Sequence, residues 1–369
     1  MVKDLILGLL FIAAVAHAQS NPTNSQDPSP HIRKFVEVEQ GINLEVLDWG
    51  RTGRSIILLP GSGNTAHIYD EFAPKLTSFG HVYGITRRGF GASSHPDTGY
   101  AEQRLAEDVL SVMRQLKIIN PVLIGHSMSG EELTWLGNQH SDLLSGLVYL
   151  AAGADPTDLP FMDKQYMELA HKLPAAMQPG SPPTDADRSS VQATSRWLTS
   201  RVHVVFPLGE IYASNIIKPD GRVEDFPDGS RIHTLIGKGA QKPDYSGVAV
   251  PILDFVDGDC PPKQADVVCL SNRNPDYVPK NDKERQAIDD FWAATDVYIY
   301  RWMDEIRKAH ASIRFIDIPR ANHYVFLSNT SDVLRELETF LKGLPPTSIS
   351  APQQPTAVPQ AWTNDHRQP

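Results

Sequence analysis

A serine lies in a short glycine-rich turn in the first half of the chain. Residues 125–130 read GHSMSG, a near match to the pattern G-x-S-x-G, with Ser129 at the last place and Gly130 one residue later. The motif directly follows an apolar run and directly precedes a helical pattern, and a tight strand-to-helix turn tolerates only small residues at its flanks. Such a turn exposes the serine hydroxyl at a helix N-terminus, which favours a developing anion. We therefore predict that Ser127 is a nucleophile.

A histidine near the C-terminal end has the position that a general base needs. His323 follows the apolar run 313–318, which predicts a strand. A histidine in the loop after the last strand can reach the nucleophile and take its proton. The chain has 13 histidines, so the prediction depends on the position of His323 and not on its type. For His126, beside the serine, we expect a packing or supporting role.

A second glycine-rich loop follows another apolar run. Residues 59–64 read LPGSGN. The glycine spacing resembles a dinucleotide-binding fingerprint, but that site needs an acidic residue at the end of the next strand. Residues 83–86 there read YGIT, with no acid. We favour an oxyanion loop, in which the backbone N–H groups of Ser62 and Met128 stabilise the anion that forms during nucleophilic attack.

Strand and helix patterns alternate around these loops. Alternating residues at 33–39 and 42–49 predict a hairpin. Continuous apolar runs at 55–60 and 121–125 predict strands that are covered on both faces. Further strands are expected at 81–86, 146–151, 250–256 and 312–318, and helices at 68–79, 101–116, 130–138, 283–310 and 331–342. This order predicts an α/β protein with a mainly parallel sheet and helices on both faces.

The alternation stops near Asp155 and returns near Val250. We predict a core formed by residues 33–154 and 249–344, with residues 155–248 inserted as a cap over the carboxyl edge of the sheet. That edge is where open α/β sheets bind ligands. Residues 19–32 predict a linker and residues 345–369 a disordered tail, because polar, proline-rich segments cannot bury enough surface to fold.

The first 18 residues have the pattern of a signal peptide. An apolar run from residue 5 to residue 15 precedes Ala16-His17-Ala18, the small-x-small pattern of a cleavage site. The run is too short to cross about 30 Å of hydrocarbon as a helix. We expect export to the periplasm or the medium, and no stable membrane insertion after cleavage.

Together the motifs resemble the α/β-hydrolase superfamily, in its branch with a Ser–His–acid triad. The resemblance covers residues 33–342 and includes the hairpin, the two glycine-rich loops, the RRGFGAS turn at 87–93 and Asn322-His323. It implies an eight-stranded, mainly parallel sheet with an antiparallel second strand and a cap after the sixth. Besides Ser129, Pro60 stands where the family usually has histidine, and Thr86 where many members have aspartate; neither change removes a catalytic group.

The resemblance places the triad acid after the seventh strand, where residues 251–260 read PILDFVDGDC. We rank Asp259 first, because it lies nearest the usual distance from the strand. Asp257, at the strand end, and Asp155, after the sixth strand as in some relatives, remain alternatives. Asp254, Asp257 and Asp259 lack calcium-loop spacing and the chain has no H-E-x-x-H motif, so we expect no metal and no cofactor.

The two cysteines, Cys260 and Cys269, lie beside these candidate acids. Two cysteines exclude a four-cysteine zinc site. In an oxidising compartment they could close a short loop, which stabilises a protein by about 2–3 kcal/mol in the chain-entropy model. We predict a disulfide that holds the loop of the acid, with two free thiols as the alternative.

Charge and nucleophile type limit the function. The net charge of −10 leaves no basic surface for nucleic acid. Within the superfamily, a serine nucleophile argues against dehalogenases and epoxide hydrolases, which attack with aspartate. We predict a carboxylesterase-like hydrolase that acts on small apolar esters. The apolar character of the predicted cap supports this substrate class through Phe161, Met162, Tyr166, Met167, Trp197, Phe206 and Tyr212.

Three other functions use the same residues. A peptidase of the proline-iminopeptidase type would need cap carboxylates for a free amine, and Glu210, Asp220, Glu224 and Asp225 are available. A cofactor-free haloperoxidase or perhydrolase would use the same triad. A hydrolase-fold binding protein without turnover is the alternative from a different class.

Overall fold

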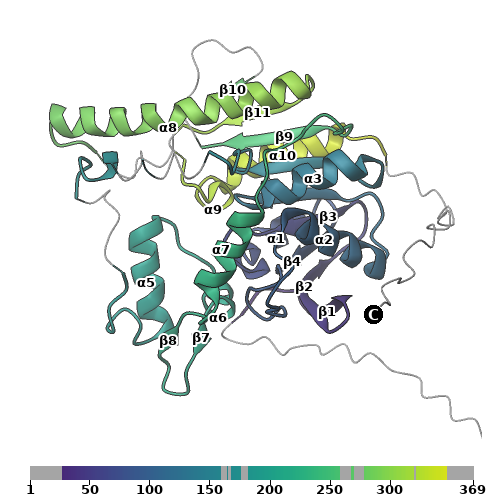
Figure 1. Ribbon diagram of the computed structural model, residues 1–369, viewed down its shortest axis with the longest axis horizontal. Coiled ribbons are helices and arrows are strands. Elements are labelled where there is room, and N and C mark those ends of the chain that lie inside the picture. Colours follow the sequence, from purple (N-terminus) through teal and green to yellow (C-terminus); the bar gives the residue numbers. More distant parts are fainter. Residues whose placement is uncertain are drawn as a thin grey trace, which may run out of the picture.

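One large sheet forms the centre of the protein (Figure 1). The computed structural model describes residues 27–158, 164, 168–175, 182–257, 267–269, 278–319 and 321–346. Within these residues the sheet has nine strands, in the order β1-β2-β4-β3-β5-β6-β9-β11-β10. They are β1 (Ile32–Glu39), β2 (Ile42–Gly50), β3 (Ser55–Leu59), β4 (His81–Ile85), β5 (Val122–His126), β6 (Gly146–Leu150), β9 (Ile252–Val256), β10 (Val267–Cys269) and β11 (Arg314–Asp317).

The sheet is mainly parallel, as predicted. Strand β2 runs antiparallel to its neighbours β1 and β4, and the remaining pairs are parallel. The eight expected strands are present, and β10 adds a ninth at one edge, beside β11. Three residues are too few to show a period in the sequence, so β10 escapes prediction. Because the carboxyl ends of β5, β9 and β11 point the same way, the residues that follow them meet at one edge.

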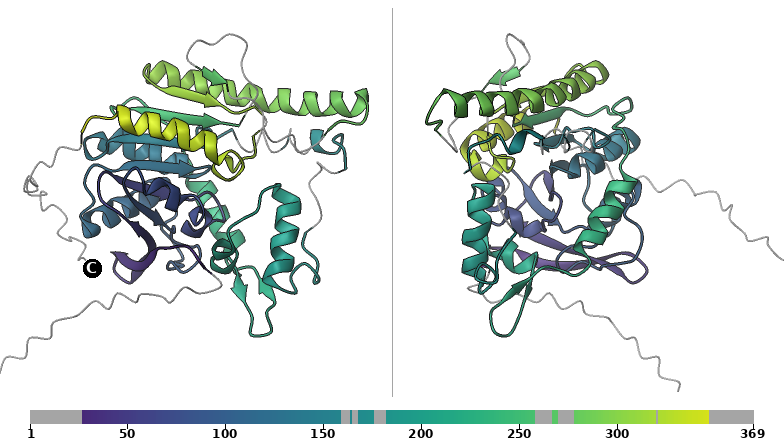
Figure 2. Two further views of the ribbon diagram at one scale, coloured as in Figure 1. Left: turned by 180° about the vertical axis from the view of Figure 1, so that it is seen from behind. Right: turned by 60° about the vertical axis from the view of Figure 1, so that its left-hand side comes forward.

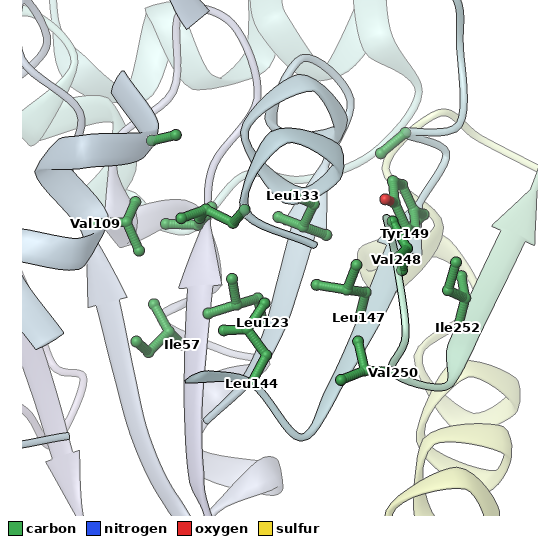
Figure 3. Close-up of a cluster of buried hydrophobic side chains, with 14 of the residues drawn as sticks. Ile57, Val109, Leu123, Leu133, Leu144, Leu147, Tyr149, Val248, Val250 and Ile252 are labelled. Atoms are coloured by element: carbon green, nitrogen blue, oxygen red, sulfur yellow. The ribbon is translucent and has the colours of Figure 1, made fainter. Parts of the chain in front are cut away.

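Three helices cover one face of the sheet. They are α2 (Glu102–Leu116), α3 (Ser129–His140) and α8 (Asp282–Ala309). Figure 3 shows Val109 of α2 and Leu133 of α3 packed over Leu123 and Leu147 of the strands. All four side chains are buried, and each buried aliphatic side chain of this size contributes about 1.5–3 kcal/mol. This burial holds α3, and therefore the turn that precedes it, against the sheet.

Other helices cover the opposite face. Figure 2 (left) brings α10 (Thr330–Gly343) to the front of this face, and α9 (Val325–Ser328) precedes it. The helix predicted at 68–79 is instead two pieces, η1 (Ala66–Tyr69) and α1 (Ala73–Leu76). Pro74 explains this break, because proline has no N–H for a continuous helix and is accepted only in a first turn.

The chain between β6 and β9 forms the segment that we assign to a cap. It contains α5 (Val191–Val202), α6 (Leu208–Ala213), the small hairpin of β7 (Ile216–Ile217) and β8 (Val223–Glu224), and α7 (Gly229–Gly239). In Figure 1, α5 and the hairpin lie apart from the sheet, and α7 leads back towards it.

The predicted terminal segments lie mostly outside the described residues. These include the signal peptide, the linker up to residue 26 and the tail from residue 347. Residues 27–31, within the predicted linker, are packed against the core: Ser29 Oγ donates to the Asp70 carbonyl, and Trp49 Nε1 donates to Ser29 Oγ. Among the described residues, no helix has the combination of length and apolar character that crossing a bilayer requires.

Candidate active site

Ser127 occupies the turn between β5 and α3. Its φ of 53° lies in the left-handed region, which is uncommon for any residue other than glycine and stores backbone strain. The Ser127 N–H donates to the Leu150 carbonyl, and the Ser127 carbonyl accepts from the Gly130 N–H. A Cβ at Gly130 would overlap the carbonyl of Ala152, so this position requires glycine. The turn is therefore held by its neighbours in the conformation that the motif predicts.

Ser127, His323 and Asp257 form a continuous chain of contacts. His323 Nε2 lies 2.9 Å from Ser127 Oγ, and His323 Nδ1 lies 3.2 Å from Asp257 Oδ2. The three residues follow β5, β11 and β9, so the parallel sheet itself brings them to one edge. This geometry suits proton transfer from the serine, with the carboxylate holding the imidazole in the required tautomer.

The structure places the three candidate acids differently from our ranking. Asp257, one of the two alternatives, is the residue at His323. It comes directly after the last residue of β9, so no further turn is needed to bring it to the histidine. Asp259, ranked first, lies outside the described residues. Asp155 is buried elsewhere and accepts hydrogen bonds from the backbone and hydroxyl of Thr157.

His126 supports the loop that carries the predicted base. Its Nε2 lies 3.0 Å from the carbonyl oxygen of His323, so the Nε2–H donates to that carbonyl. Burial, reinforced by the neighbouring His323, lowers the pKa of His126 well below its ordinary value, so the ring stays neutral. The rings of His323 and Tyr324 both lie 4.8 Å from that of His126. The hydrogen bond from His126 to the His323 carbonyl is thus consistent with the supporting role that we expected of His126.

The loop predicted to stabilise the oxyanion lies against Ser127. A Cβ at Gly61 would lie 2.7 Å from His126 Nδ1 and 3.1 Å from Ser127 Cβ, so glycine permits this close approach. Ser62 and Met128 line the same cavity as Ser127. The Ser62 hydroxyl also lies 2.7 Å from Nδ1 of His233, a residue of α7. The cap segment therefore contacts the loop that carries the predicted oxyanion donor.

The cavity beside Ser127 has a volume of about 490 Å³. Asp257 and His323 lie along it together with the serine. Much of the remaining lining is apolar and comes from α7, from α8 and from the segment after β6: Ala152, Ala154, Pro156, Ile236, Ala240, Trp292, Ile299 and Trp302. A cavity of this size and character suits a small ligand with an apolar group.

Among the described residues, the aromatic lining of the cavity comes from none of the cap residues that we predicted. Phe206 and Tyr212 pack in the core on the face of α10, and Trp197 lies under the guanidinium of Arg201. Phe161, Met162, Tyr166 and Met167 lie outside the described residues. The aromatic wall comes instead from Trp292 and Trp302 of α8. Their spacing on one helix face with Ile299 is the sequence signal that could have identified them.

A glutamate that the sequence analysis did not single out also lines the cavity. Glu131 lies in the first turn of α3, four residues after Ser127. Burial, together with the charges of Glu132 and Glu102, raises the pKa of Glu131 to about 8. At neutral pH its carboxyl is therefore protonated and can donate a hydrogen bond into the cavity.

The four carboxylates that a peptidase would need do not lie in this cavity. Glu210 is fully buried in α6 and accepts hydrogen bonds from Asn64 Nδ2 and from the backbone and hydroxyl of Thr65. Glu224 pairs with Lys218, Asp225 pairs with Arg188, and Asp220 accepts from the Arg222 N–H. Among the described lining residues, none of the four appears.

Cys269 lies in β10, and Cys260 lies outside the described residues. The predicted disulfide between them stays a prediction.

Known proteins resemble this chain in two respects: in part of their sequence and in their fold. Residues 56–337, well over half of the chain, match a model of the alpha/beta hydrolase family. A pyrethroid hydrolase of Sphingobium wenxiniae is 32% identical over 106 residues, which are 27% of this chain and 36% of that protein. A non-heme chloroperoxidase of Streptomyces lividans is 33% identical over 100 residues, again 27% and 36%. The chain spans less than half the length of the curated relatives it matches.

Solved structures agree with the family match. An E-2-(acetamidomethylene)succinate hydrolase superposes with a TM-score of 0.59 at 16% identity, over 85% of this chain and 100% of that one. An enol-lactonase from Burkholderia xenovorans superposes with a TM-score of 0.50 at 18% identity, over 84% and 100%. At these identities the likeness concerns the fold alone. The family model and the shared fold show that this chain belongs to the alpha/beta hydrolase family.

Proposed function

We propose that this hydrolase cleaves small, uncharged carboxylic esters through an acyl-enzyme intermediate. The observation that carries the proposal is the contact chain from Ser127 Oγ through His323 to Asp257, at the wall of an apolar cavity. Among the described residues that line this cavity, none is a lysine or an arginine that would hold an anionic substrate. The lining therefore favours neutral esters with an apolar acyl or alcohol group.

The proposed reaction has two steps. Ser127 Oγ attacks the ester carbonyl while His323 Nε2 takes the hydroxyl proton, and Asp257 stabilises the resulting imidazolium. The backbone N–H groups of Ser62 and Met128 stabilise the oxyanion. As the ester C–O bond breaks, His323 gives the proton to the leaving alcohol. Water then attacks the acyl-enzyme, and its proton passes through His323 to Ser127 as the acid leaves.

A panel of chromogenic substrates tests the proposal. Purified protein is assayed with p-nitrophenyl esters of increasing acyl length and with amino-acid p-nitroanilides, beside Ser127→Ala as the control. We expect hydrolysis of the esters and a loss of about 10³-fold or more in the control. Preferential cleavage of the anilides would replace the proposal by a peptidase. A lack of turnover with every substrate, in folded protein, would favour a binding protein.

A perhydrolase or haloperoxidase activity is the second candidate, favoured by the similarity to the Streptomyces chloroperoxidase. Hydrogen peroxide would replace water in the second step, so that the acyl-enzyme yields a peracid and free Ser127, and the peracid would oxidise halide. Bromination of monochlorodimedone with acetate, peroxide and bromide measures this reaction. A rate above that of ester hydrolysis would make it the main activity.

We also propose that the chain is exported, with cleavage after Ala18. The support is the short apolar run followed by Ala16-His17-Ala18. N-terminal sequencing of the protein from periplasm and medium tests this. A mature chain that begins at Gln19 is expected, and an intact N-terminus in the cytoplasm contradicts it.

A further inference from the structure

A second cluster of chemically active side chains lies outside the cavity at Ser127. Asp27, His31, His67 and Asp70 each offer one ligand atom, and these atoms all lie within 4.8 Å of one another. We refer to these four residues as the His–Asp cluster. They come from two segments, the N-terminal residues before β1 and the turn around η1. None of them lines the cavity, and the proposed ester hydrolysis uses none of them.

The side chains of the cluster contact one another in pairs. His67 Nδ1 lies 3.1 Å from Asp70 Oδ2 and 3.3 Å from Asp27 Oδ2. His31 Nδ1 lies 3.5 Å from Asp70 Oδ1, and His31 Nε2 lies 3.2 Å from Asp27 Oδ2. Donor atoms about 2.0–2.2 Å from a tetrahedral zinc ion lie about 3.3–3.6 Å from each other. The contacts of His67 Nδ1 and His31 Nδ1 with Asp70 are close to this range, whereas the contact of His31 with Asp27 uses the other ring nitrogen, so small side-chain rotations would complete the site.

Two buried atoms of the cluster point to a ligand between them. In the described part of the chain, neither His31 Nδ1 nor Asp70 Oδ1 has a hydrogen-bond partner. The two side chains are only 5% and 4% exposed, and the two atoms face each other. Buried polar atoms nearly always have a partner, and leaving one without costs about 1–3 kcal/mol. A cation between the two atoms would satisfy both.

The surroundings of the cluster also fit a metal site. A Cβ at Gly209 of α6 would overlap Asp70 Oδ2 and would lie 3.2 Å from His67 Nδ1. The backbone of this glycine therefore packs directly against one side of the cluster. On the far side of the His67 ring, Nε2 faces the fully buried Glu45, whose Oε1 lies 3.6 Å away. A carboxylate that accepts a hydrogen bond from the second nitrogen of a metal-binding histidine fixes its tautomer, and Glu45 would do so after a small approach.

We propose that Asp27, His31, His67 and Asp70 bind one divalent transition-metal ion, zinc by preference, as a structural site. Two imidazoles and two carboxylates form a nitrogen–oxygen donor set that suits zinc, whereas calcium and magnesium prefer oxygen alone. Four protein ligands leave no open position for substrate. The ion would fasten the N-terminal segment to η1, directly beside the backbone of α6.

Protons and a metal ion would compete for the same ligand atoms in this cluster. Burial favours neutral His67, but the neighbouring carboxylates of Asp27, Asp70 and Glu45 outweigh burial and raise the pKa of His67 well above its ordinary value. Without an ion, protonated His67 would hold the carboxylates together as an ion-pair network. A metal ligand must be unprotonated, so metal affinity should fall as the pH is lowered.

Measurements of metal content and thermal unfolding distinguish a metal-bound cluster from a metal-free ion-pair network. The full chain is stripped with a chelator, incubated with zinc, desalted and measured by inductively coupled plasma mass spectrometry. We expect one zinc per chain in the wild type, and a melting temperature that rises with zinc and falls again with the chelator. The double variant His31→Gln/His67→Gln should bind less than about one-tenth as much.

His81→Gln is the matched control, because His81 also pairs with a carboxylate, Asp48, and no second acid pairs with it in the described parts of the chain. It should bind zinc like the wild type. Cobalt in place of zinc should give the intense visible bands of a tetrahedral site in the wild-type protein, so the test holds even if the double variant fails to fold. Folded wild type without stoichiometric zinc, cobalt bands or a thermal shift would overturn the proposal, as would equal zinc in the double variant.

Discussion

The hydroxyl of Ser129 donates a hydrogen bond to the carbonyl oxygen of Pro60, 2.6 Å away. This bond joins the turn of the nucleophile to the loop predicted to stabilise the oxyanion. Both residues are departures from the usual pattern of the family, which has glycine and histidine at these places. The structure shows that the two departures contact each other, with Arg87 Nη2 donating to both at 3.0 and 3.2 Å.

Restoring the usual glycine should therefore weaken catalysis. Ser129→Gly removes the bond to Pro60 but keeps the turn small, and Arg87 retains its own bond to the Pro60 carbonyl. We expect kcat for an ester to fall by about tenfold, the equivalent of one ordinary hydrogen bond, with an unchanged fold by circular dichroism. Ser129→Ala should behave in the same way. Full activity in both variants would show that the bond does not position the loop.

Asp257 should be the carboxylate on which the rate depends. Asp257→Asn removes the acceptor for His323 Nδ1, and loss of the triad acid lowers kcat by about 10⁴-fold when the geometry is kept. Asp155→Asn is the matched control, because Asp155 contacts Thr157, and it should retain most of its activity. Asp259→Asn tests the rival acid directly. A larger loss in Asp259→Asn than in Asp257→Asn would contradict the geometry.

The protonated Glu131 should limit activity at alkaline pH. Its pKa of about 8 lies far above the ordinary value, so the carboxyl gains a negative charge as the pH rises through about 8. That charge forms in the cavity lined by Ser62 and Met128, the proposed oxyanion donors, and would oppose the oxyanion. We expect kcat/KM of the wild type to decline above about pH 8, and Glu131→Gln to remove the decline. Identical pH profiles for both proteins would exclude this role.

Asp254 should make the fold less stable at higher pH. It is fully buried in β9, and among the described residues none donates a hydrogen bond to its carboxyl oxygens. Burial, with the charge of Asp257, raises its pKa to about 8, against about 3.9 in an unfolded chain. The folded state thus holds a proton that the unfolded chain releases, and stability falls as the pH rises from about 4 to about 8.

Asp254→Asn removes this dependence. Its melting temperature, relative to that of the wild type, should rise by several degrees between about pH 5 and about pH 9. The exposed Asp142 offers the control, and Asp142→Asn should leave the difference unchanged. A constant offset between Asp254→Asn and the wild type at all pH values would mean that Asp254 ionises normally.

Reduction should lower activity before it unfolds the sheet, if Cys260 and Cys269 are bonded. The bond would restrain the segment that follows Asp257, while β10 remains paired with β11. Ester hydrolysis and circular dichroism are followed together during titration with a reductant. Activity that survives full reduction contradicts this role for the cysteines.

Local sequence patterns predicted the parts of the site that depend on single loops. Ser127 stands in a motif whose strand-turn-helix context is visible along the chain, and His323 follows the last parallel strand. The end of β9 at Val256 agrees with the predicted strand 250–256, so the choice between Asp257 and Asp259 depended on how far beyond the strand the acid lies, which local patterns do not show. The wall formed by Trp292 and Trp302 required knowledge of which face of α8 meets the cavity.

Long-range contacts could not be predicted in the same way. The His–Asp cluster joins Asp27 and His31 to His67 and Asp70 across about 40 residues, so it has no short motif with metal-ligand spacing. The bond between Ser129 and Pro60 likewise exists only once the sheet places β3 beside β5. In each case the sequence shows the individual residues, but only the folded structure shows that they contact each other.

Labelling with a fluorophosphonate probe tests the central claim most directly. The probe phosphonylates a serine only when a neighbouring base activates it, so peptide mapping should place the adduct on Ser127 in the folded wild type. Ser127→Ala should not react, and His323→Ala should react far more slowly. Folded wild-type protein that leaves Ser127 unlabelled, or carries the adduct on another serine, would contradict the assignment of Ser127 as the nucleophile.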